Sequence, residues 1–126
     1  MKSAIAVAQW LRSRAEVETV LHPALSNAPG HALWKRDFTG ASGLFSIILK
    51  PASESAVAAM LDGMDLFSMG YSWGGYESLI VPFKPQRTAT TWQSDGQALR
   101  LHIGLEHPDD LLADLDSGFA RLRAAS

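Results

Sequence analysis

The sequence predicts a small α/β domain, a two-layer sandwich in which helices pack on one face of a β-sheet. Two observations lead to this fold class. Short apolar or alternating runs typical of strands alternate along the chain with segments that repeat apolar residues at helical spacing. Each helical segment also keeps its apolar residues on one side, so that each helix needs only one partner layer. No linker-like stretch divides the 126 residues, which fits one domain.

Composition excludes several classes of protein. Apolar residues make up 47% of the chain and charged residues 19%, as expected for a globular domain with a core. The absence of cysteine excludes a disulfide scaffold, a thiolate metal site and a cysteine nucleophile. The net charge of −2 argues against a nucleic-acid partner. No apolar run approaches the ~18 residues that cross a bilayer, and the N-terminus lacks a signal-peptide pattern. We therefore expect a cytoplasmic domain without a membrane partner.

The first elements are a helix, a strand and a helical turn. Residues 3–14 are predicted to be helical because apolar residues recur at helical spacing from Ala4 to Leu11. Residues 17–21 form a short β-branched strand, which ends at His22-Pro23 because the residue before a proline is pushed into an extended conformation. A helical turn is expected over residues 30–38.

The middle of the chain contains a buried strand and an amphipathic helix. Residues 43–49 are short and almost wholly apolar, which predicts a central strand covered on both faces. Ser53 is a suitable N-cap for the helix that follows, whose apolar stripe runs from Val57 to Met64. Residues 66–82 offer two short strands, one around Phe67 and one over residues 79–81.

The C-terminal elements are the best specified. Residues 98–103 alternate, so that Arg100 and His102 face away from the apolar positions between and beside them. The last helix begins at Pro108, and acidic residues in its first turn complement the helix dipole. Its predicted buried stripe is Leu111, Leu115, Phe119 and Leu122.

Residues 70–74 read Gly-Tyr-Ser-Trp-Gly and match G-x-S-x-G, the nucleophile elbow of α/β-hydrolases. Asp95 and then His102 or His107 even follow Ser72 in the Ser…Asp…His order of those enzymes. An elbow needs a helix directly after the serine, however, whereas Gly74, Gly75 and a β-prone run follow here. We therefore expect that Ser72 is not a nucleophile.

Two other motifs are equally weak. His102, Glu106 and His107 resemble an inverted zinc motif, but the spacing is too long and the histidines lie on a strand end and a loop rather than on one helical face. We expect hydrogen-bonded or surface histidines and no metal site. The pair Gly74-Gly75 lacks the pattern and the following helix of a phosphate loop, and is better explained by a turn.

Arg100 has two possible roles at this point. It is either a solvent-exposed arginine on an edge strand, or a guanidinium aimed into a cleft to bind a carboxylate through two parallel hydrogen bonds. The alternating pattern is compatible with both.

Four blocks of sequence are distinctive. Residues 22–25 read His-Pro-Ala-Leu, residues 34–38 Trp-Lys-Arg-Asp-Phe, residues 70–79 Gly-Tyr-Ser-Trp-Gly-Gly-Tyr-Glu-Ser-Leu and residues 99–106 Leu-Arg-Leu-His-Ile-Gly-Leu-Glu. These blocks resemble the Cys/Met-metabolism family of pyridoxal-phosphate (PLP) enzymes, and in particular its cystathionine β-lyase branch. The order and spacing match from about Ala4 to Leu122. The Ser-x-Gly-Gly-x-Glu-Ser core belongs to the wider family, while Trp73, Tyr76 and the Trp-Lys-Arg-Asp-Phe block point to the β-lyase branch.

The resemblance implies that residues 1–126 are the C-terminal domain of a longer enzyme, with a mostly antiparallel sheet as in fold-type I PLP enzymes. A large cofactor-binding domain precedes it in the family and carries the Schiff-base lysine. In the family this lysine lies in a Ser-x-x-Lys-type context. None of the four lysines of this chain has that context: Lys2, Lys35, Lys50 and Lys84. We therefore expect no catalytic residue, no bound PLP and no activity in this chain alone, with PLP as the cofactor of the intact enzyme.

The resemblance also implies roles in binding substrate. Arg100 matches the arginine that binds the substrate α-carboxylate, Ser72 and Trp73 match the residues that assist it, and His102 is expected only to support the site. The implied reaction of the intact enzyme, expected to be a homotetramer, is α,β-elimination of L-cystathionine to homocysteine, pyruvate and ammonia, within methionine biosynthesis. The alternatives are a related family enzyme such as a cystathionine γ-synthase, or a non-catalytic amino-acid-binding module.

Overall fold

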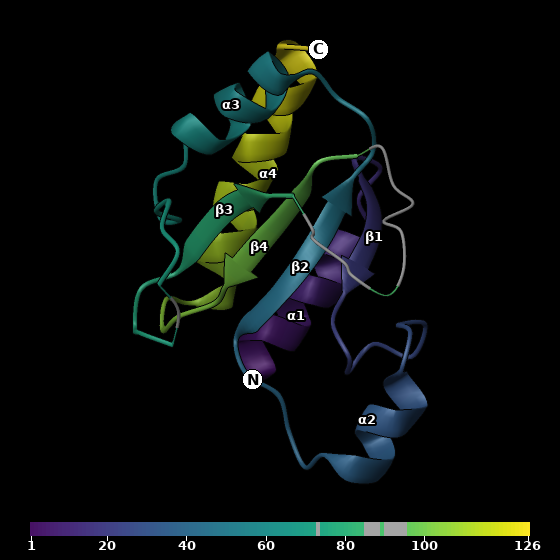
Figure 1. Ribbon diagram of the computed structural model, residues 1–126. Helices are drawn as coiled ribbons and strands as arrows, with labels where there is room; N and C mark the ends of the chain where they lie inside the picture. Colours follow the sequence, from purple (N-terminus) through teal and green to yellow (C-terminus); the bar gives the residue numbers. More distant parts are fainter. Residues whose placement is uncertain (73, 85–88, 90–95) are drawn as a thin grey trace.

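A computed structural model describes residues 1–72, 74–84, 89 and 96–126, and this part of the chain contains a four-stranded antiparallel sheet and four helices (Figure 1). The elements in chain order are α1 (Lys2–Arg12), β1 (Val17–Leu21), α2 (His31–Asp37), β2 (Leu44–Leu49), α3 (Glu54–Asp62), β3 (Leu79–Phe83), β4 (Ala98–His102) and α4 (Pro108–Ala124). Both the α/β class and the antiparallel sheet are confirmed.

The strand order is β1-β2-β4-β3, so that β2 and β4 lie inside the sheet and β1 and β3 form its edges. Arg100 therefore lies on an inner strand, and the edge-strand interpretation of this residue is wrong. In the register, Arg100 is paired with Ser46 on one side and with Val81 on the other. Neighbouring side chains alternate between the two faces, so that Leu99 and Leu101 point away from Arg100.

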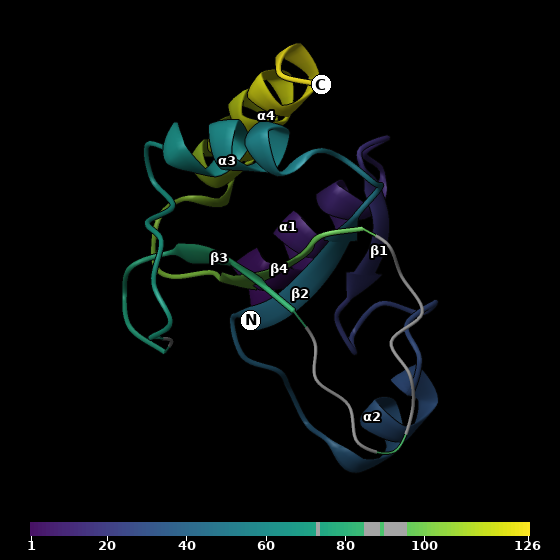
Figure 2. The ribbon, with the colours of Figure 1, turned by 45° about the horizontal axis from the view of Figure 1, so that its top comes forward.

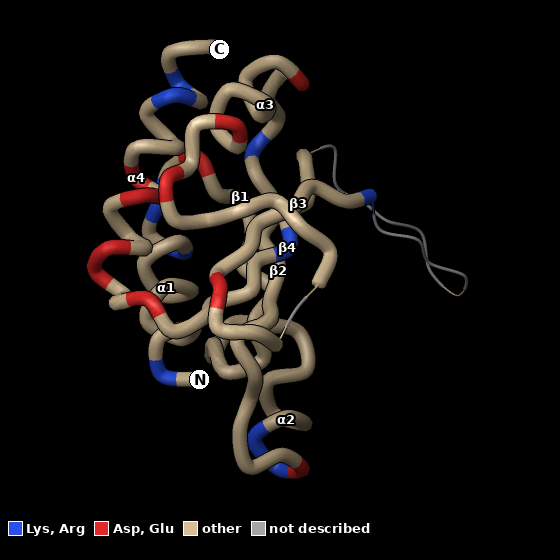
Figure 3. Tube along the Cα trace, turned by 90° about the vertical axis from the view of Figure 1, so that its left-hand side faces the viewer, with Lys and Arg blue, Asp and Glu red and all other residues tan. Residues whose placement is uncertain are grey.

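Helices α1 and α4 cover one face of this sheet, and α3 packs on α4 (Figure 2). Seen along the sheet edge, both covering helices lie on the same side, while α2 lies beyond one end of the strands (Figure 3). Helix α2 contributes no buried residue and is therefore peripheral to the core. This arrangement is the predicted two-layer sandwich. Because helices cover only one face, Leu44 and Ser46 on the other face are half-buried, and the expectation that β2 is enclosed on both sides is only partly met.

The core lies between the sheet and the helices. The four predicted stripe residues of α4 are buried, and Leu111, Leu115 and Phe119 are wholly inaccessible. The stripe of α1, which consists of Ala4, Val7, Ala8 and Leu11, is also inaccessible. Among the described residues, no helix has the length and apolar character that a bilayer-spanning segment requires.

Two caps and one buried carboxylate define the ends of α3 and α4. The hydroxyl of Ser53 accepts a hydrogen bond from the Ala56 amide, as predicted for an N-cap. At the start of α4, Pro108 occupies the first turn, and the His107 side chain caps the helix by accepting from the Asp109 amide. Further along α4, the buried Asp114 carboxylate accepts three backbone N–H groups from residues 65–67.

The contact with Asp114 replaces one of the predicted strands. Because the amides of residues 65–67 bond to a side chain, they are not available for a strand ladder, and the expected strand around Phe67 is absent. Only a single parallel bridge forms there, between Ser68 and Leu79. Phe67 itself is buried, which explains its apolar character. The chain then leads from this anchor into the segment that carries Ser72.

Candidate functional site

The open face of the sheet carries two polar side chains on its inner strand β4. Arg100 and His102 are two positions apart and therefore share this face, as the sequence predicts. Arg100 is half-buried, whereas His102 is only 7% exposed. Both side chains extend toward the segment that connects α3 with β3. The site is therefore built from one rigid strand and one irregular segment.

Arg100 reaches the peptide group that precedes Ser72. Its Nη2 donates to the Tyr71 carbonyl oxygen at 2.5 Å. Among the described residues Arg100 has no carboxylate partner, whereas Arg14, Arg36 and Arg123 each form an ion pair with an acidic side chain. A half-buried guanidinium that is engaged only by a carbonyl retains N–H donors for a bidentate contact with an anion.

The segment beside Arg100 is irregular and exposed. Ser72 is exposed, and Gly74 has a φ of 87°, which is the left-handed conformation that favours glycine. No helix follows Ser72: residues 74–78 run directly into β3. The described residues after Ser72 therefore lack the helix of a nucleophile elbow, and that Ser72 is not a nucleophile stays a prediction. Trp73 and Asp95 lie outside the described residues.

Two backbone carbonyls in the second half of this segment are held by His102 of β4 and by Leu105, which follows β4. The Leu105 amide donates to the Tyr76 carbonyl oxygen at 2.9 Å, and His102 Nε2 lies 3.0 Å from the Gly75 carbonyl oxygen. A Cβ atom on Gly104 would lie 2.1 Å from the Tyr76 oxygen, so that only glycine allows this approach.

Ser78 and Glu106 fasten the same segment with side-chain hydrogen bonds. The Glu106 carboxylate accepts from the Ser78 amide at 3.1 and 3.0 Å and from the Ser78 hydroxyl at 3.0 Å, while that hydroxyl accepts from the Gly104 amide at 2.9 Å. Ser78 is wholly buried. The sequence reasoning assigned no role to this pair, although its position at the end of the glycine-rich motif and just after β4 was a signal that the two ends meet.

Within the described part of the chain, the histidines do not form a metal site. Glu106 is engaged by Ser78, and no group of three or more His, Asp or Glu side chains in the described ranges lies close enough to hold a metal ion. His22 is 1% exposed, and its Nδ1 accepts from the Ala24 amide at 3.1 Å. Burial and, to a lesser degree, the positive N-terminus lower the pKa of His22. The expectation of hydrogen-bonded histidines is confirmed for His22 and His102.

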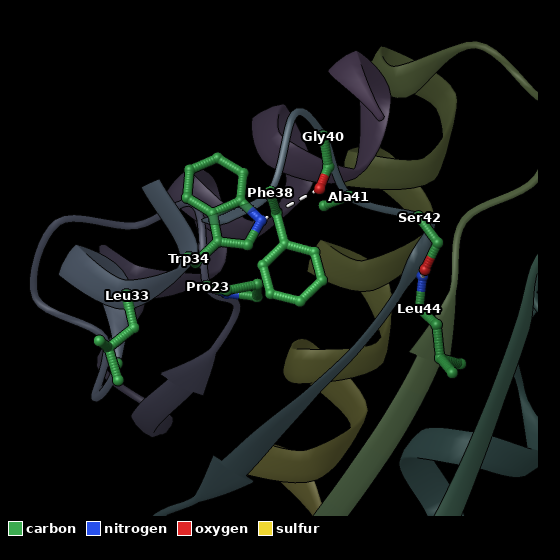
Figure 4. A pocket seen from close by; sticks show the side chains of 9 residues that line it. Pro23, Leu33, Trp34, Phe38, Gly40, Ala41, Ser42 and Leu44 are labelled. Atoms are coloured by element: carbon green, nitrogen blue, oxygen red, sulfur yellow. Dashed lines mark hydrogen bonds between the residues drawn. The ribbon is translucent and has the colours of Figure 1, made fainter. Parts of the chain in front are cut away.

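A separate apolar hollow of about 420 Å³ lies between α2 and the start of β2 (Figure 4). Trp34 and Phe38 of the α2 region form one wall, and Trp34 Nε1 donates to the Gly40 carbonyl oxygen at 3.1 Å. Its other lining residues are Pro23, Gly30, Leu33, Ala41, Ser42 and Leu44. None of the described residues that line this hollow is charged, so that they offer no ionic contact to a ligand.

No described residue is suited to hold PLP covalently. All four lysines are exposed and lie outside the Arg100 site: Lys2, Lys35, Lys50 and Lys84. A Schiff-base lysine functions from a desolvated environment beside its cofactor, and these side chains have no such environment. No lysine of this chain therefore has the environment of a Schiff-base lysine.

The sequence profile of the Cys/Met metabolism PLP-dependent enzyme family matches residues 1–120. The chain belongs to this family. Among curated proteins, it is 51% identical over 127 residues to a cystathionine β-lyase of Escherichia coli, and 50% identical over 127 residues to that of Salmonella typhimurium. Each alignment covers 96% of this chain and 32% of the relative, so that the chain spans about a third of the length of the curated relatives it matches.

Solved structures of the family share the fold. A cystathionine γ-synthase of Xanthomonas oryzae, solved in complex with cystathionine, matches with a TM-score of 0.84 and 38% identity over 99% of this chain and 34% of that one. A Campylobacter jejuni O-acetylhomoserine (thiol)-lyase that contains a pyridoxyl-lysine matches with a TM-score of 0.77 and 32% identity over 94% of this chain and 27% of that one.

Proposed function

We propose that this chain is the C-terminal, substrate-anchoring domain of a PLP-dependent carbon–sulfur lyase, and that Arg100 binds the α-carboxylate of an amino-acid substrate. The observation that carries the proposal is the half-buried guanidinium on an inner strand, engaged by the Tyr71 carbonyl and by no carboxylate of the described residues. Because β4 is hydrogen-bonded on both sides, the charge is held on a rigid element.

The planar guanidinium suits a carboxylate because two parallel N–H groups match its two oxygens. In the proposal, Ser72 and Trp73 assist Arg100. Ser72 does so through its hydroxyl, which is a neutral hydrogen-bond donor. Holding the carboxylate at one end fixes the direction of the bonds at the adjacent Cα, which is an effect of orientation. The contribution of this chain is thus binding and alignment of the substrate.

PLP is assigned to the rest of the intact enzyme, because the lysines of this chain are exposed and outside the site. When bound, PLP supplies the electron sink that stabilises negative charge at Cα. The sheet face that the helices leave open carries the partly exposed apolar residues Leu44 and Phe83, which supports docking on that cofactor-binding part. The chain alone is expected to bind no PLP and to be inactive.

The proposed reaction of the intact enzyme is α,β-elimination of L-cystathionine to homocysteine, pyruvate and ammonia, in methionine biosynthesis. The cystathionine β-lyase relatives at about 50% identity support it. Other relatives carry different activities, including a cystathionine γ-lyase of Mus musculus at 38% identity and an L-alanine/L-glutamate racemase of Wolbachia pipientis at 43%. A carboxylate anchor fits all of these, since it recognises a group that their amino-acid ligands share. The family resemblance also supports a homotetramer in the cytoplasm.

The test is a comparison of Arg100 and Ser72 variants in the PLP-loaded enzyme. We expect Arg100→Ala to lose about 2–5 kcal/mol of transition-state binding, a decrease in kcat/KM of about 30-fold to several thousandfold, with PLP retained. Arg100→Lys should recover little, since an ammonium lacks the planar fork. Ser72→Ala should be milder, because it removes one neutral donor.

A nucleophilic serine predicts the reverse order, with Ser72→Ala inactive and Ser72 labelled by a fluorophosphonate. That label, or normal turnover by Arg100→Ala, would refute the carboxylate anchor. A panel of cystathionine, cysteine and alanine separates the lyase from a synthase or racemase. Failure of the intact protein to turn over any amino acid would favour the non-catalytic binding module.

A further inference from the structure

Tyr71 and Gly75, which lie on either side of Ser72 in the sequence, each contact a side chain of the same strand through the carbonyl oxygen. The Tyr71 carbonyl accepts from Arg100 Nη2, and the Gly75 carbonyl lies 3.0 Å from His102 Nε2. Arg100 and His102 are two positions apart on β4, on the same face of the sheet. Two polar side chains of β4 therefore contact two carbonyls of the Ser72 turn, which is defined by the described residues 71, 72, 74 and 75.

The two side chains differ in burial. His102 is only 7% exposed, whereas Arg100 is half-buried. A carbonyl oxygen can only accept a hydrogen bond, so that Nε2 of His102 is the donor and carries the proton. The other ring nitrogen, Nδ1, is buried and has no hydrogen-bond partner among the described residues. The ring therefore has one polar contact there, and that contact is with the turn.

From this geometry we propose that His102 is a positioning residue that holds the Ser72 turn in place when Arg100 binds a carboxylate. Arg100 has two tasks in this proposal, because the N–H groups that it does not use for the Tyr71 carbonyl are the ones that bind a substrate anion. His102 has only the contact with Gly75 among the described residues. Its bond to Gly75 keeps the turn, and with it the Ser72 hydroxyl, at a constant position relative to β4. The inference rests on the proposed function for its kinetic consequence, but not for the contact itself.

The test compares two substitutions of His102 whose side-chain amides differ in length, glutamine and asparagine. In His102→Gln the side-chain nitrogen occupies a place close to that of Nε2, so that it can still donate to the Gly75 carbonyl. In His102→Asn the amide is shorter and lies near the place of Nδ1, where it cannot reach. His102→Leu fills the buried space without any donor and serves as a second removal variant if the Asn protein does not fold. His107→Gln makes the same chemical change at an exposed histidine that caps α4 and does not contact the turn.

The kinetic readout is kcat/KM of the PLP-loaded enzyme, with the melting temperature of each variant measured alongside. We expect His102→Asn and His102→Leu to lower kcat/KM by about tenfold to hundredfold, the size of effect that a displaced binding group produces. The kcat/KM of His102→Gln should stay within about threefold of the wild-type value, because the amide keeps the bond to Gly75. The kcat/KM of His107→Gln should do the same even if this variant melts lower, because it leaves that bond intact. In an Arg100→Ala background, His102→Asn should have little further effect, since the anchor that the turn serves is gone.

A crystal structure of the holoenzyme with His102→Asn or His102→Leu tests the contact without reference to activity. The proposal predicts that residues 71, 72, 74 and 75 shift relative to β4 in these variants and superimpose on the wild type in His102→Gln. A turn that superimposes in all of them, or equal kcat/KM for the Asn and Gln enzymes, overturns the positioning role. If Arg100→Ala leaves kcat/KM normal while the turn still shifts in His102→Asn, the carboxylate anchor has failed and the positioning contact stands.

Discussion

Asp114 is expected to be the most sensitive polar position in the fold, and Asp114→Asn is the change that tests it. The buried carboxylate accepts from the amides of Asp65, Leu66 and Phe67 at 2.9, 2.9 and 3.0 Å, with two of the three bonds made to the same oxygen. Asparagine keeps one acceptor oxygen and replaces the other with an NH₂ group, which is itself a donor. At least one backbone N–H is therefore left facing a donor inside the protein.

The expected loss follows from these bonds. Hydrogen bonds to a charged group contribute about 1.5–3 kcal/mol each, and a buried unsatisfied donor costs a similar amount, so that Asp114→Asn should lower the free energy of unfolding by about 3–5 kcal/mol. For a chain of this length that corresponds to a decrease in Tm of roughly 10–20 °C. Urea unfolding followed by circular dichroism measures the free energy, and calorimetry measures Tm.

Asp116→Asn is the matched control, because it makes the same change one half-turn further along the same helix. Asp116 is exposed and pairs with Arg14 at 2.9 Å, and exposed ion pairs contribute at most about 1 kcal/mol. Equal losses for the two variants, or a loss below about 1 kcal/mol for Asp114→Asn, would show that the carboxylate does not organise residues 65–67 as described.

Two further predictions concern stability. Phe119→Ala removes a wholly buried ring and should lower the free energy of unfolding, measured in urea, by about 3–5 kcal/mol. Leu112→Ala, at a partly buried position, should cost clearly less. A Phe119→Ala protein that melts within about a degree of the wild type would contradict the docking of α4. Because the folded state lowers the pKa of His22 below 6.5, it binds fewer protons than the unfolded chain, so that stability is full above about pH 6.5 and decreases below it by up to about 1.4 kcal/mol per pH unit. His22→Asn, whose amide oxygen can still accept from the Ala24 amide, should reduce this dependence between pH 7.5 and 5.5; an unchanged slope would mean that another group is responsible.

The elements were largely predictable because their signals are local. The alternation around Arg100 reports which residues share a face, and the spacing of Leu111, Leu115 and Phe119 reports a helical stripe that has to be covered. Ser53 predicts a helix start because its hydroxyl satisfies an amide only a few residues away. The strand expected at Phe67 failed for a non-local reason, since Asp114 takes up the amides that a ladder would need.

The site was predictable only in part. The shared face of Arg100 and His102 follows from the period of a strand, but their functional meaning came from the family resemblance and not from the pattern. The contacts between Arg100 and the Tyr71 carbonyl and between Ser78 and Glu106 join positions 29 and 28 residues apart. No periodicity in the sequence encodes which loop carbonyl or carboxylate faces which strand.

The amino-acid sequence is sufficient to specify most of the elements, the buried sides of α1, α3 and α4 and the side of β4 on which Arg100 lies, because these depend on backbone geometry that repeats over a few residues. Tertiary structure alone decides that β4 is an inner strand, that Arg100 has no carboxylate neighbour among the described residues, and that His102 points its Nε2 at Gly75. Strand order depends on long-range pairing, and partner choice depends on which desolvated polar groups remain to be satisfied once the core has closed. Both are properties of the packed molecule.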